Sequence, residues 1–401
     1  MNKTREIQVK GLLVQALFWA SYCAYSSFIV NMLTDYGYPS ATATGMMTAT
    51  SVLSFIAQPV SGYICDNFIS HKRVYIALTI CALPTMVLLS RCLFSPVLTM
   101  ALMLLFTVFM VQMPGLLDAW VIGLTNLYPG VNYGLCRGSS SLLFAIAAQA
   151  MGWVTAQFGH GARMWLGAAL GLLSVIVAFT LKELPTRRQA ETAAGEANSR
   201  NPHGLSTGET VKILVRNKCY LLLLAMNFLL FLGYSCVSSF IPVLTEQLGG
   251  GSGEVGTVFA LNALAEVPAM FLMSAVLRKV PAKKVILFAA VFFVLRLGLT
   301  AMSVNFTMML LVQLLQGFSF AVIWPASMGY LNQIVEDGVR STAIMTYSSV
   351  TLGVSAIFGN LFGTLILSAA GDVRMVFGFS ALVAGLGLML GVYGMIRKIW
   401  K

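Results

Sequence analysis

The chain has 401 residues, of which 58% are hydrophobic and only 10% are charged, and its formal net charge is +11. Soluble domains carry about 25% charged residues, so this composition excludes a soluble protein and indicates an integral membrane protein. The positive charge by itself would also fit a nucleic-acid-binding protein, so its distribution along the chain has to decide between the two.

Apolar runs long enough to cross a bilayer core of about 30 Å recur along the chain. Basic residues precede the first run, which is as long as a span and lacks a small-residue cleavage site, so we expect no cleavable signal peptide. The predicted fold is an all-α membrane protein with twelve transmembrane helices, at 11–34, 43–65, 74–94, 97–125, 133–158, 163–181, 219–245, 254–277, 284–303, 306–333, 339–369 and 374–397.

The basic residues indicate the orientation of these spans. With the N-terminus inside, 20 of the 25 Lys and Arg fall in cytoplasmic segments, as the positive-inside rule requires. Arg91, Arg163 and Arg374 fall outside, and Arg137 and Arg296 remain within spans. We therefore predict cytoplasmic termini in a plasma membrane, the inner membrane of a bacterium, and no binding of nucleic acid.

A polar segment at 182–218 separates two sets of six spans, 1–181 and 219–401. The segment is rich in Ala, Gly, Ser, Thr and charge, which predicts a cytoplasmic linker that is helical in part at most. Two bundles of equal size suggest an internal duplication. Such repeats usually form a solute site at their interface, near the middle of the bilayer.

Only two of the fourteen acids, Asp118 and Glu266, lie well inside predicted spans, and the two buried bases are Arg137 and Arg296. Asp118 precedes the turn at Tyr128 by ten residues and Arg137 follows it by nine, so both should reach a similar depth on neighbouring helices.

Glu266 and Arg296 are placed in the same way, each fifteen residues from the turn near Pro281. Ionisable residues inside a membrane are costly and usually mark solute or proton pathways. The alternative is a pair of buried salt bridges that only fix helix packing, and such bridges are weak evidence for stability.

Proton coupling would need a carboxylate that can be protonated during transport. The three histidines, His71, His160 and His203, fall outside the predicted spans. By elimination, the proton carrier is Glu266 or Asp118, with Arg296 as a further coupling residue, provided that the protein is coupled to protons at all.

The stretch "QPVSGYICDNFISHKR" at 58–73 resembles the loop between spans 2 and 3 of the major facilitator superfamily. Gly62, Asp66, Lys72 and Arg73 fit the pattern of that loop, whereas Asn67 replaces its first base. The resemblance implies two six-helix bundles, and it implies that the four matching residues form a gating loop.

"YGLCRGSSS" at 133–141 resembles the start of span 5 in the branch that holds lactose permease, nucleoside–proton symporters and phenylpropionate permease. The resemblance places Asp118 where lactose permease keeps a sugar-binding glutamate, and Arg137 at its arginine partner. Span 10 departs from lactose permease, because Gln313 and Gln316 stand among the positions that hold Lys, His and Glu there. Its coupling mechanism therefore cannot be transferred intact, and facilitated diffusion stays open.

Other polar side chains could line a cavity. Trp19, Tyr22 and Tyr25 recur at i, i+3 and i+6 on one side of the first span, where they could stack on a ring or simply pack against a neighbouring helix. Neutral hydrogen-bonding groups outnumber the buried charges, which favours an uncharged polyhydroxylated or heterocyclic solute. The candidates are Gln58, Asn227, Tyr234, Gln313, Gln316, Trp324 and Tyr347.

The leading interpretation is a secondary transporter that imports a small polar organic solute by proton symport and alternating access. A sugar or glycoside comes first, with nucleosides and small aromatic acids next; a drug–proton antiporter and a sensor or membrane enzyme are the other classes. We predict a monomer that is surrounded by membrane lipid, that is not an enzyme, and that needs no cofactor and no metal.

Overall fold

The computed structural model describes residues 3–128, 130–131, 133–184, 207–336 and 340–400. Within these ranges every regular element is a helix, as the apolar spans predict. The chain divides into two compact units. Unit 1 comprises Met1–Pro39, Val52–Ser199 and Gly250–Leu264, and unit 2 comprises Ser40–Ser51, Arg200–Gly249 and Ala265–Lys401. The domain boundaries at 181 and 219 stay a prediction.

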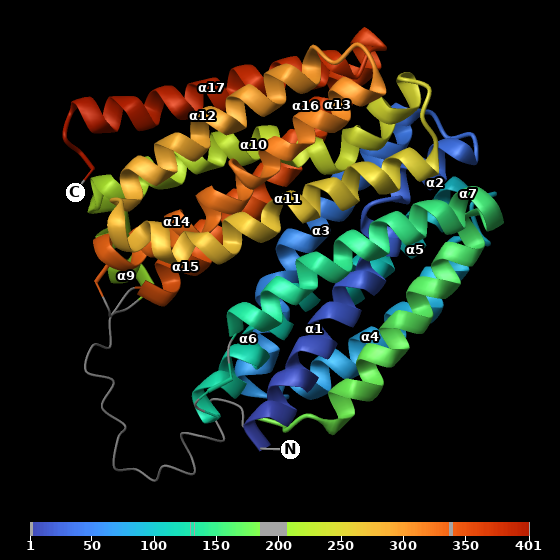
Figure 1. The fold of residues 1–401 in the computed structure, drawn as a ribbon, viewed down its shortest axis with the longest axis horizontal. Coiled ribbons are helices and arrows are strands. Elements are labelled where there is room, and N and C mark those ends of the chain that lie inside the picture. The colour runs from blue at the N-terminus through green and yellow to red at the C-terminus, as the bar shows by residue number, and fades with distance from the viewer. Residues whose placement is uncertain (1–2, 129, 132, 185–206, 337–339, 401) are drawn as a thin grey trace. The chain divides into compact units, whose positions relative to one another are not determined.

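Unit 1 contains six whole helices, most of α3 and the first part of α11 (Figure 1). Their bounds are α1 (Lys3–Ser26), α2 (Ile29–Asp35), α3 (Ser40–Asn67), α4 (His71–Leu89), α5 (Pro96–Met110), α6 (Met113–Leu127), α7 (Tyr133–Thr180) and α11 (Ser252–Lys279).

Unit 2 contains the other ends of α3 and α11 and the remaining elements, which include a 3₁₀ turn, η2, and a π-helical turn, η4. Their bounds are α9 (Thr207–Arg216), α10 (Lys218–Gln247), α12 (Ala282–Ala301), α13 (Phe306–Val312), η2 (Gln313–Gly317), α14 (Phe320–Ile334), α15 (Arg340–Ser348), η4 (Ser349–Val354), α16 (Ser355–Ala370) and α17 (Arg374–Ile396).

Ten helices of the described chain are long and apolar enough to cross a membrane. One of them runs from 135 to 180 and contains two predicted spans, because α7 bends at Gly159, whose φ of 80° and ψ of 173° are not helical. Figure 1 shows the two halves of α7, teal and green, turning back on each other at this bend. The predicted span at 43–65 lies within α3.

Arg163, which the sequence places on the outer side of the membrane, follows this bend. The helix resumes after Gly159, and the side chain of Arg163 turns inward and has no exposed area. Its Nη1 donates to Thr155 Oγ1 at 3.2 Å, and its guanidinium lies 4.9 Å from the ring centre of Phe28 on the N-terminal side. His160 is also only partly exposed and lies 2.8 Å from the same Nη1.

Polar contacts between helices supplement apolar packing inside each unit, as is usual where lipid supplies no hydrophobic driving force. In unit 1, the hydroxyls of Tyr75 on α4 and Ser174 on α7 lie 2.6 Å apart, and Ser174 also donates to the carbonyl of Val14 on α1. In unit 2, Ser355 Oγ on α16 donates to the carbonyl of Phe228 on α10 at 3.1 Å.

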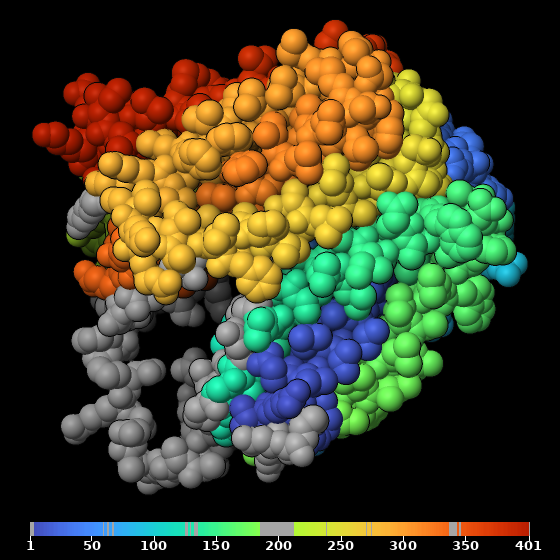
Figure 2. Space-filling view, in the orientation of Figure 1, coloured from blue at the N-terminus to red at the C-terminus, as the bar shows by residue number. Residues whose placement is uncertain are grey.

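The outward faces of the helices are apolar. On α11 and α12, which form the yellow to light-orange surface of Figure 2, large exposed side chains include Phe271, Leu272, Phe288 and Val291. Exposed apolar side chains in such numbers indicate contact with lipid. The chain is therefore a multi-pass membrane protein.

Candidate functional site

A buried hydrogen-bond network in unit 1 is centred on Gln15, which sequence reasoning did not single out. Gln15 on α1 is fully buried, and its Nε2 donates to Asp118 Oδ1 on α6 at 2.8 Å. Ser140 Oγ on α7 donates to Gln15 Oε1 at 3.3 Å. The amide therefore joins three helices, and it holds a half-buried carboxylate against α1.

Arg137, the predicted partner of Asp118, makes a different contact. Its guanidinium lies over the ring of Trp19, with Cζ 4.7 Å from the ring centre. Among the described residues, Asp118 and Arg137 form no ion pair within 4.0 Å. Both belong to unit 1 and are half-buried, so an acid and a base are held near α1 by separate partners.

The three aromatic residues of α1 do not act as one surface. Trp19 and Tyr22 pack edge to face at 5.9 Å and are half-buried, and Trp19 lies under the guanidinium of Arg137. Tyr25 is only 3% exposed and packs against Phe106 of α5 at 4.1 Å between ring centres. Tyr25 therefore belongs to the core of unit 1, the packing role that the sequence left open.

A second network lies in unit 2 and joins the other predicted acid and base through a glutamine. Gln316 Nε2 donates to Glu266 Oε1 on α11 at 2.6 Å and to the hydroxyl of Tyr234 on α10 at 3.2 Å. Gln316 Oε1 accepts from Arg296 Nη1 on α12. An amide thus links Glu266 and Arg296, the second acid and base that the sequence singles out.

Gln313 completes the surroundings of Arg296. Its Oε1 accepts from Arg296 Nε at 3.2 Å and from Nη2 at 2.7 Å. Arg296 is 2% exposed, and its guanidinium also lies 6.0 Å from the ring centre of Tyr234. A buried guanidinium needs several acceptors to offset its lost hydration. Gln313 and Gln316 supply them from one short turn, η2.

Aromatic rings continue from this network along unit 2. Phe231 lies 5.9 Å from Tyr234 and 5.8 Å from Trp324, and Trp324 lies 5.8 Å from Tyr347. Tyr347 has no exposed area, and its hydroxyl has no hydrogen-bond partner among the described residues. The π-helical turn η4 begins two residues after Tyr347, and such turns are frequent at functional sites.

Two predicted binding residues are not brought to either network. Gln58 is exposed, and its amide donates to Ser54 of its own helix at 3.1 Å. Asn227 is buried, but its Nδ2 donates to the carbonyl of Leu223 one turn earlier. A single polar residue in an apolar helix gives no indication of the direction in which it points.

The predicted gating loop contacts the end of α7. Lys72 Nζ donates to the carbonyls of Phe179 at 2.8 Å and Leu181 at 2.6 Å, so a cation caps the C-terminus of this helix. Arg73 forms a 2.7 Å ion pair with Glu183. The surroundings of Gly62 and of the Asp66 side chain lie outside what the structure describes.

Glu183 is held from two sides in this loop. Ser70 Oγ donates to Glu183 Oε1 at 2.7 Å. This hydrogen bond, together with the guanidinium of Arg73, keeps the pKa of Glu183 below its ordinary value. The segment that follows α7 is therefore tied to the start of α4.

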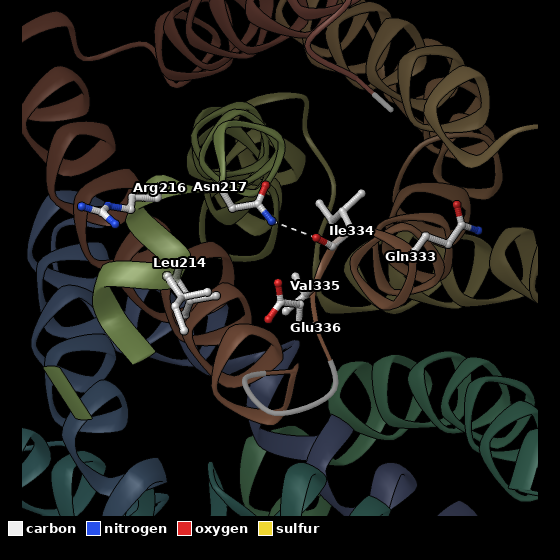
Figure 3. Close-up of a pocket in the computed structure, with 8 residues that line it drawn as sticks. Leu214, Arg216, Asn217, Gln333, Ile334, Val335 and Glu336 are labelled. Atoms are coloured by element: carbon white, nitrogen blue, oxygen red, sulfur yellow. Dashed lines mark hydrogen bonds between the residues drawn. The ribbon is translucent and has the colours of Figure 1, made fainter. Parts of the chain in front are cut away.

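A cavity of about 500 Å³ lies in unit 2, where α9 meets α10 and α14 ends. Figure 3 shows that the Asn217 amide points to the Ile334 carbonyl, with which it forms a 2.8 Å hydrogen bond. None of the predicted binding residues lines this cavity; its walls include Leu214, Arg216, Asn217, Ile334, Val335 and Glu336.

A family model and individual known sequences match this chain, and the matched proteins are transporters. The family model described as "MFS_1 like family" matches residues 9–379. A maltose permease of Geobacillus stearothermophilus is 26% identical over 263 residues, which cover 65% of this chain and 63% of that protein. A probable 3-phenylpropionic acid transporter of Escherichia coli strain K12 is 26% identical over 290 residues, which cover 71% of each. The first match thus spans less than two thirds of its relative.

Solved structures show the same fold. The nucleoside transporter NupG superposes with a TM-score of 0.76 at 16% identity and covers all of both chains. An auto-inhibited peptide transporter of the POT family superposes with a TM-score of 0.77 at 10% identity and covers 97% of each chain. The TM-scores show a shared architecture, and identities this low leave the solute open.

Proposed function

Because this chain belongs to the MFS_1 like family, we propose that it is a secondary transporter that imports a small polar organic solute by proton symport. A sugar or glycoside is the first solute class. The proposal includes a bacterial inner membrane, two bundles that alternate in access, and a gating loop around Lys72 and Arg73.

The observation that carries the solute class is the pairing of acceptor and donor around α1. Asp118 presents a half-buried carboxylate that is oriented by Gln15, and Arg137 presents donors above the ring of Trp19. Hydroxyl groups both donate and accept, so a polyhydroxylated solute satisfies a carboxylate and a guanidinium at once. The half-buried rings of Trp19 and Tyr22 add apolar surface beside these two groups.

Glu266 supports proton coupling. It is a half-buried acid in a span, and it is linked through Gln316 to the buried cation Arg296. An acid in contact with a movable cation favours its charged form when the cation is near and its protonated form when the cation leaves. We therefore assign Glu266 as the proton carrier, with Arg296 as the cation whose position controls it.

The first test is a thermal-shift screen of the purified chain with maltose, uridine and 3-phenylpropionate. A ligand that binds the folded protein raises its melting temperature. We expect maltose to raise it in the unsubstituted chain and to have no effect in Asp118→Asn. An equal shift in both forms would remove Asp118 from the binding site.

A small aromatic acid is the second candidate, and the stacking of Arg137 on Trp19 favours it. A carboxylate would pair with the guanidinium, and an aromatic ring would pack beside the half-buried rings of Trp19 and Tyr22. A shift with 3-phenylpropionate and none with maltose would select this candidate and reject the sugar.

A further inference from the structure

The amide of Gln316 lies between two groups that carry opposite charges. It is 2% exposed, it donates to Glu266 at 2.6 Å, and it accepts from Arg296. We infer that Gln316 is a positioning residue that transmits the protonation of Glu266 to Arg296. This inference rests on the proposed role of Glu266 as the proton carrier.

The orientation of the amide follows from the chemistry of its neighbours. An ionised carboxylate can only accept hydrogen bonds and a guanidinium can only donate them. The amide nitrogen must therefore face Glu266 and the amide oxygen must face Arg296. The opposite orientation would set oxygen against oxygen and N–H against N–H, so the charge on Glu266 fixes the amide in one of its two orientations.

Protonation of Glu266 removes this requirement. The carboxylate takes one proton from water and becomes a carboxylic acid, whose O–H is a donor. The amide oxygen can then accept from Glu266 when the amide rotates, and in that orientation it no longer accepts from Arg296. Arg296 keeps Gln313, and it loses one of its two amide partners.

The backbone around Gln316 allows its side chain to lie close to Glu266. Gln316 lies in η2, a 3₁₀ turn between two α-helices, and such turns often mark a functional hinge. The next residue, Gly317, faces the carbonyl oxygen of Ala265 so closely that a Cβ atom would collide with it. Glycine therefore lets η2 lie directly against α11 beside Glu266.

Two titratable groups on other helices interact with Glu266: Tyr234 on α10 and Arg296 on α12. Tyr234 receives its hydrogen bond from the same amide nitrogen. Gln313 contacts Arg296 and Thr300 on α12 and donates to the carbonyl of Met309 on α13. Gln313 is thus a matched control on the same turn.

The test is infrared difference spectroscopy of the full chain in lipid, between acidic and alkaline samples without solute. Glu266→Gln identifies the carboxyl band of Glu266, and Arg296→Lys identifies the guanidinium bands of Arg296. In the unsubstituted chain, we expect the guanidinium bands to change at the same pH as the carboxyl band. In Gln316→Met, the carboxyl band should still titrate and the guanidinium change should be lost. In Gln313→Met, that change should remain.

A guanidinium change that survives in Gln316→Met, or that is lost equally in Gln313→Met, would overturn the inference. If Gln316→Met does not fold, the unsubstituted chain still decides, because the absence of a guanidinium change at the pH of Glu266 protonation rejects the relay. The readout needs no transport. Normal proton-driven accumulation in Glu266→Gln would reject the proposed coupling and leave the link between the two groups standing.

Discussion

Gln15 on α1 donates a 2.8 Å hydrogen bond to Asp118 on α6, and it is fully buried between them. The carboxylate is thereby held to the helix that also carries Trp19, on which Arg137 lies. Helix α1 thus contacts both the acid and the base, through Gln15 and Trp19. Substitutions at these two residues remove the two contacts separately.

Replacing Gln15 with Leu should weaken the binding of maltose by about tenfold, because a charged acceptor loses a hydrogen bond worth about 1.5–3 kcal/mol. Gln8→Leu is the control, since Gln8 lies on the same helix and contacts Cys136 of α7 at 3.2 Å. Titration calorimetry checks both variants. Equal losses in both would show that Gln15 acts only through helix packing.

Trp19→Leu should weaken binding by a few fold, because a stacked guanidinium gains about 0.5–2 kcal/mol from the ring. Arg137→Lys should weaken it further, since an ammonium lacks the planar fork. Trp153→Leu, at an exposed tryptophan of α7, is the matched control and should bind normally. Normal binding in Trp19→Leu would leave the indole with a packing role only.

Glu266→Gln should abolish uphill accumulation while exchange across the membrane continues, because an amide of the same shape binds no proton. Glu254→Gln changes an acid in the first turn of the same helix, whose Oε2 accepts from the Gly251 amide at 2.9 Å, and it should accumulate solute normally. Uptake into vesicles with and without a pH gradient distinguishes the two activities. Gradient-driven accumulation in Glu266→Gln would remove this residue as the carrier.

The contact of Glu183 with Ser70 and Arg73 should make stability depend on pH. The pKa of Glu183 is lowered in the folded chain, so its stabilisation is present above the unfolded value of about 4.3 and is lost as pH falls through the folded value. The pair is largely exposed, so the effect should stay below about 1 kcal/mol and shrink in salt. Melting curves of Glu183→Gln should show a smaller fall in acid than those of the unsubstituted chain, and identical falls would contradict this origin.

Arg163 gives a prediction about stability alone. Its Nε and Nη2 are buried without a hydrogen-bond partner among the described residues, so a charge is held at a cost. Arg163→Met should therefore leave the melting temperature unchanged or raise it. Removing a partner with His160→Ala should lower stability by about 1–3 kcal/mol, because another donor of the guanidinium is left unmet. A large fall in the melting temperature of Arg163→Met would contradict this, because it would show that the buried cation stabilises the fold.

The helical spans could be predicted from the sequence, because they depend on period and length along one chain. Glu266 and Arg296 were placed at the same depth by counting residues from Pro281, and the structure links them through one amide. The direction in which a side chain points around its helix is set by neighbours far away in sequence. Counting residues along the helices therefore could not predict that Asp118 and Arg137 would contact different partners.

Neutral residues were hardest to interpret. Gln15, Gln58 and Gln316 are all glutamines within apolar stretches of the sequence. In the structure, Gln15 and Gln316 are buried in hydrogen-bond networks, whereas Gln58 is exposed. The burial of Arg163 could not be predicted from the sequence, because only the backbone at Gly159 shows that the helix turns and carries the side chain inward. The spacing of Gln313 and Gln316 was a useful signal in the sequence. The two residues are three positions apart, which is one turn of a 3₁₀ helix, and η2 brings them together in the structure.

The central claim is that buried acids and bases serve a solute and a proton rather than helix packing alone. The most direct measurement is the accumulation of labelled maltose in vesicles that contain the purified chain and carry an inward proton gradient. We predict accumulation above the external concentration, collapse when a protonophore is added, and no maltose uptake in Asp118→Asn. Accumulation that ignores the gradient, or that is unchanged in Asp118→Asn, would contradict it.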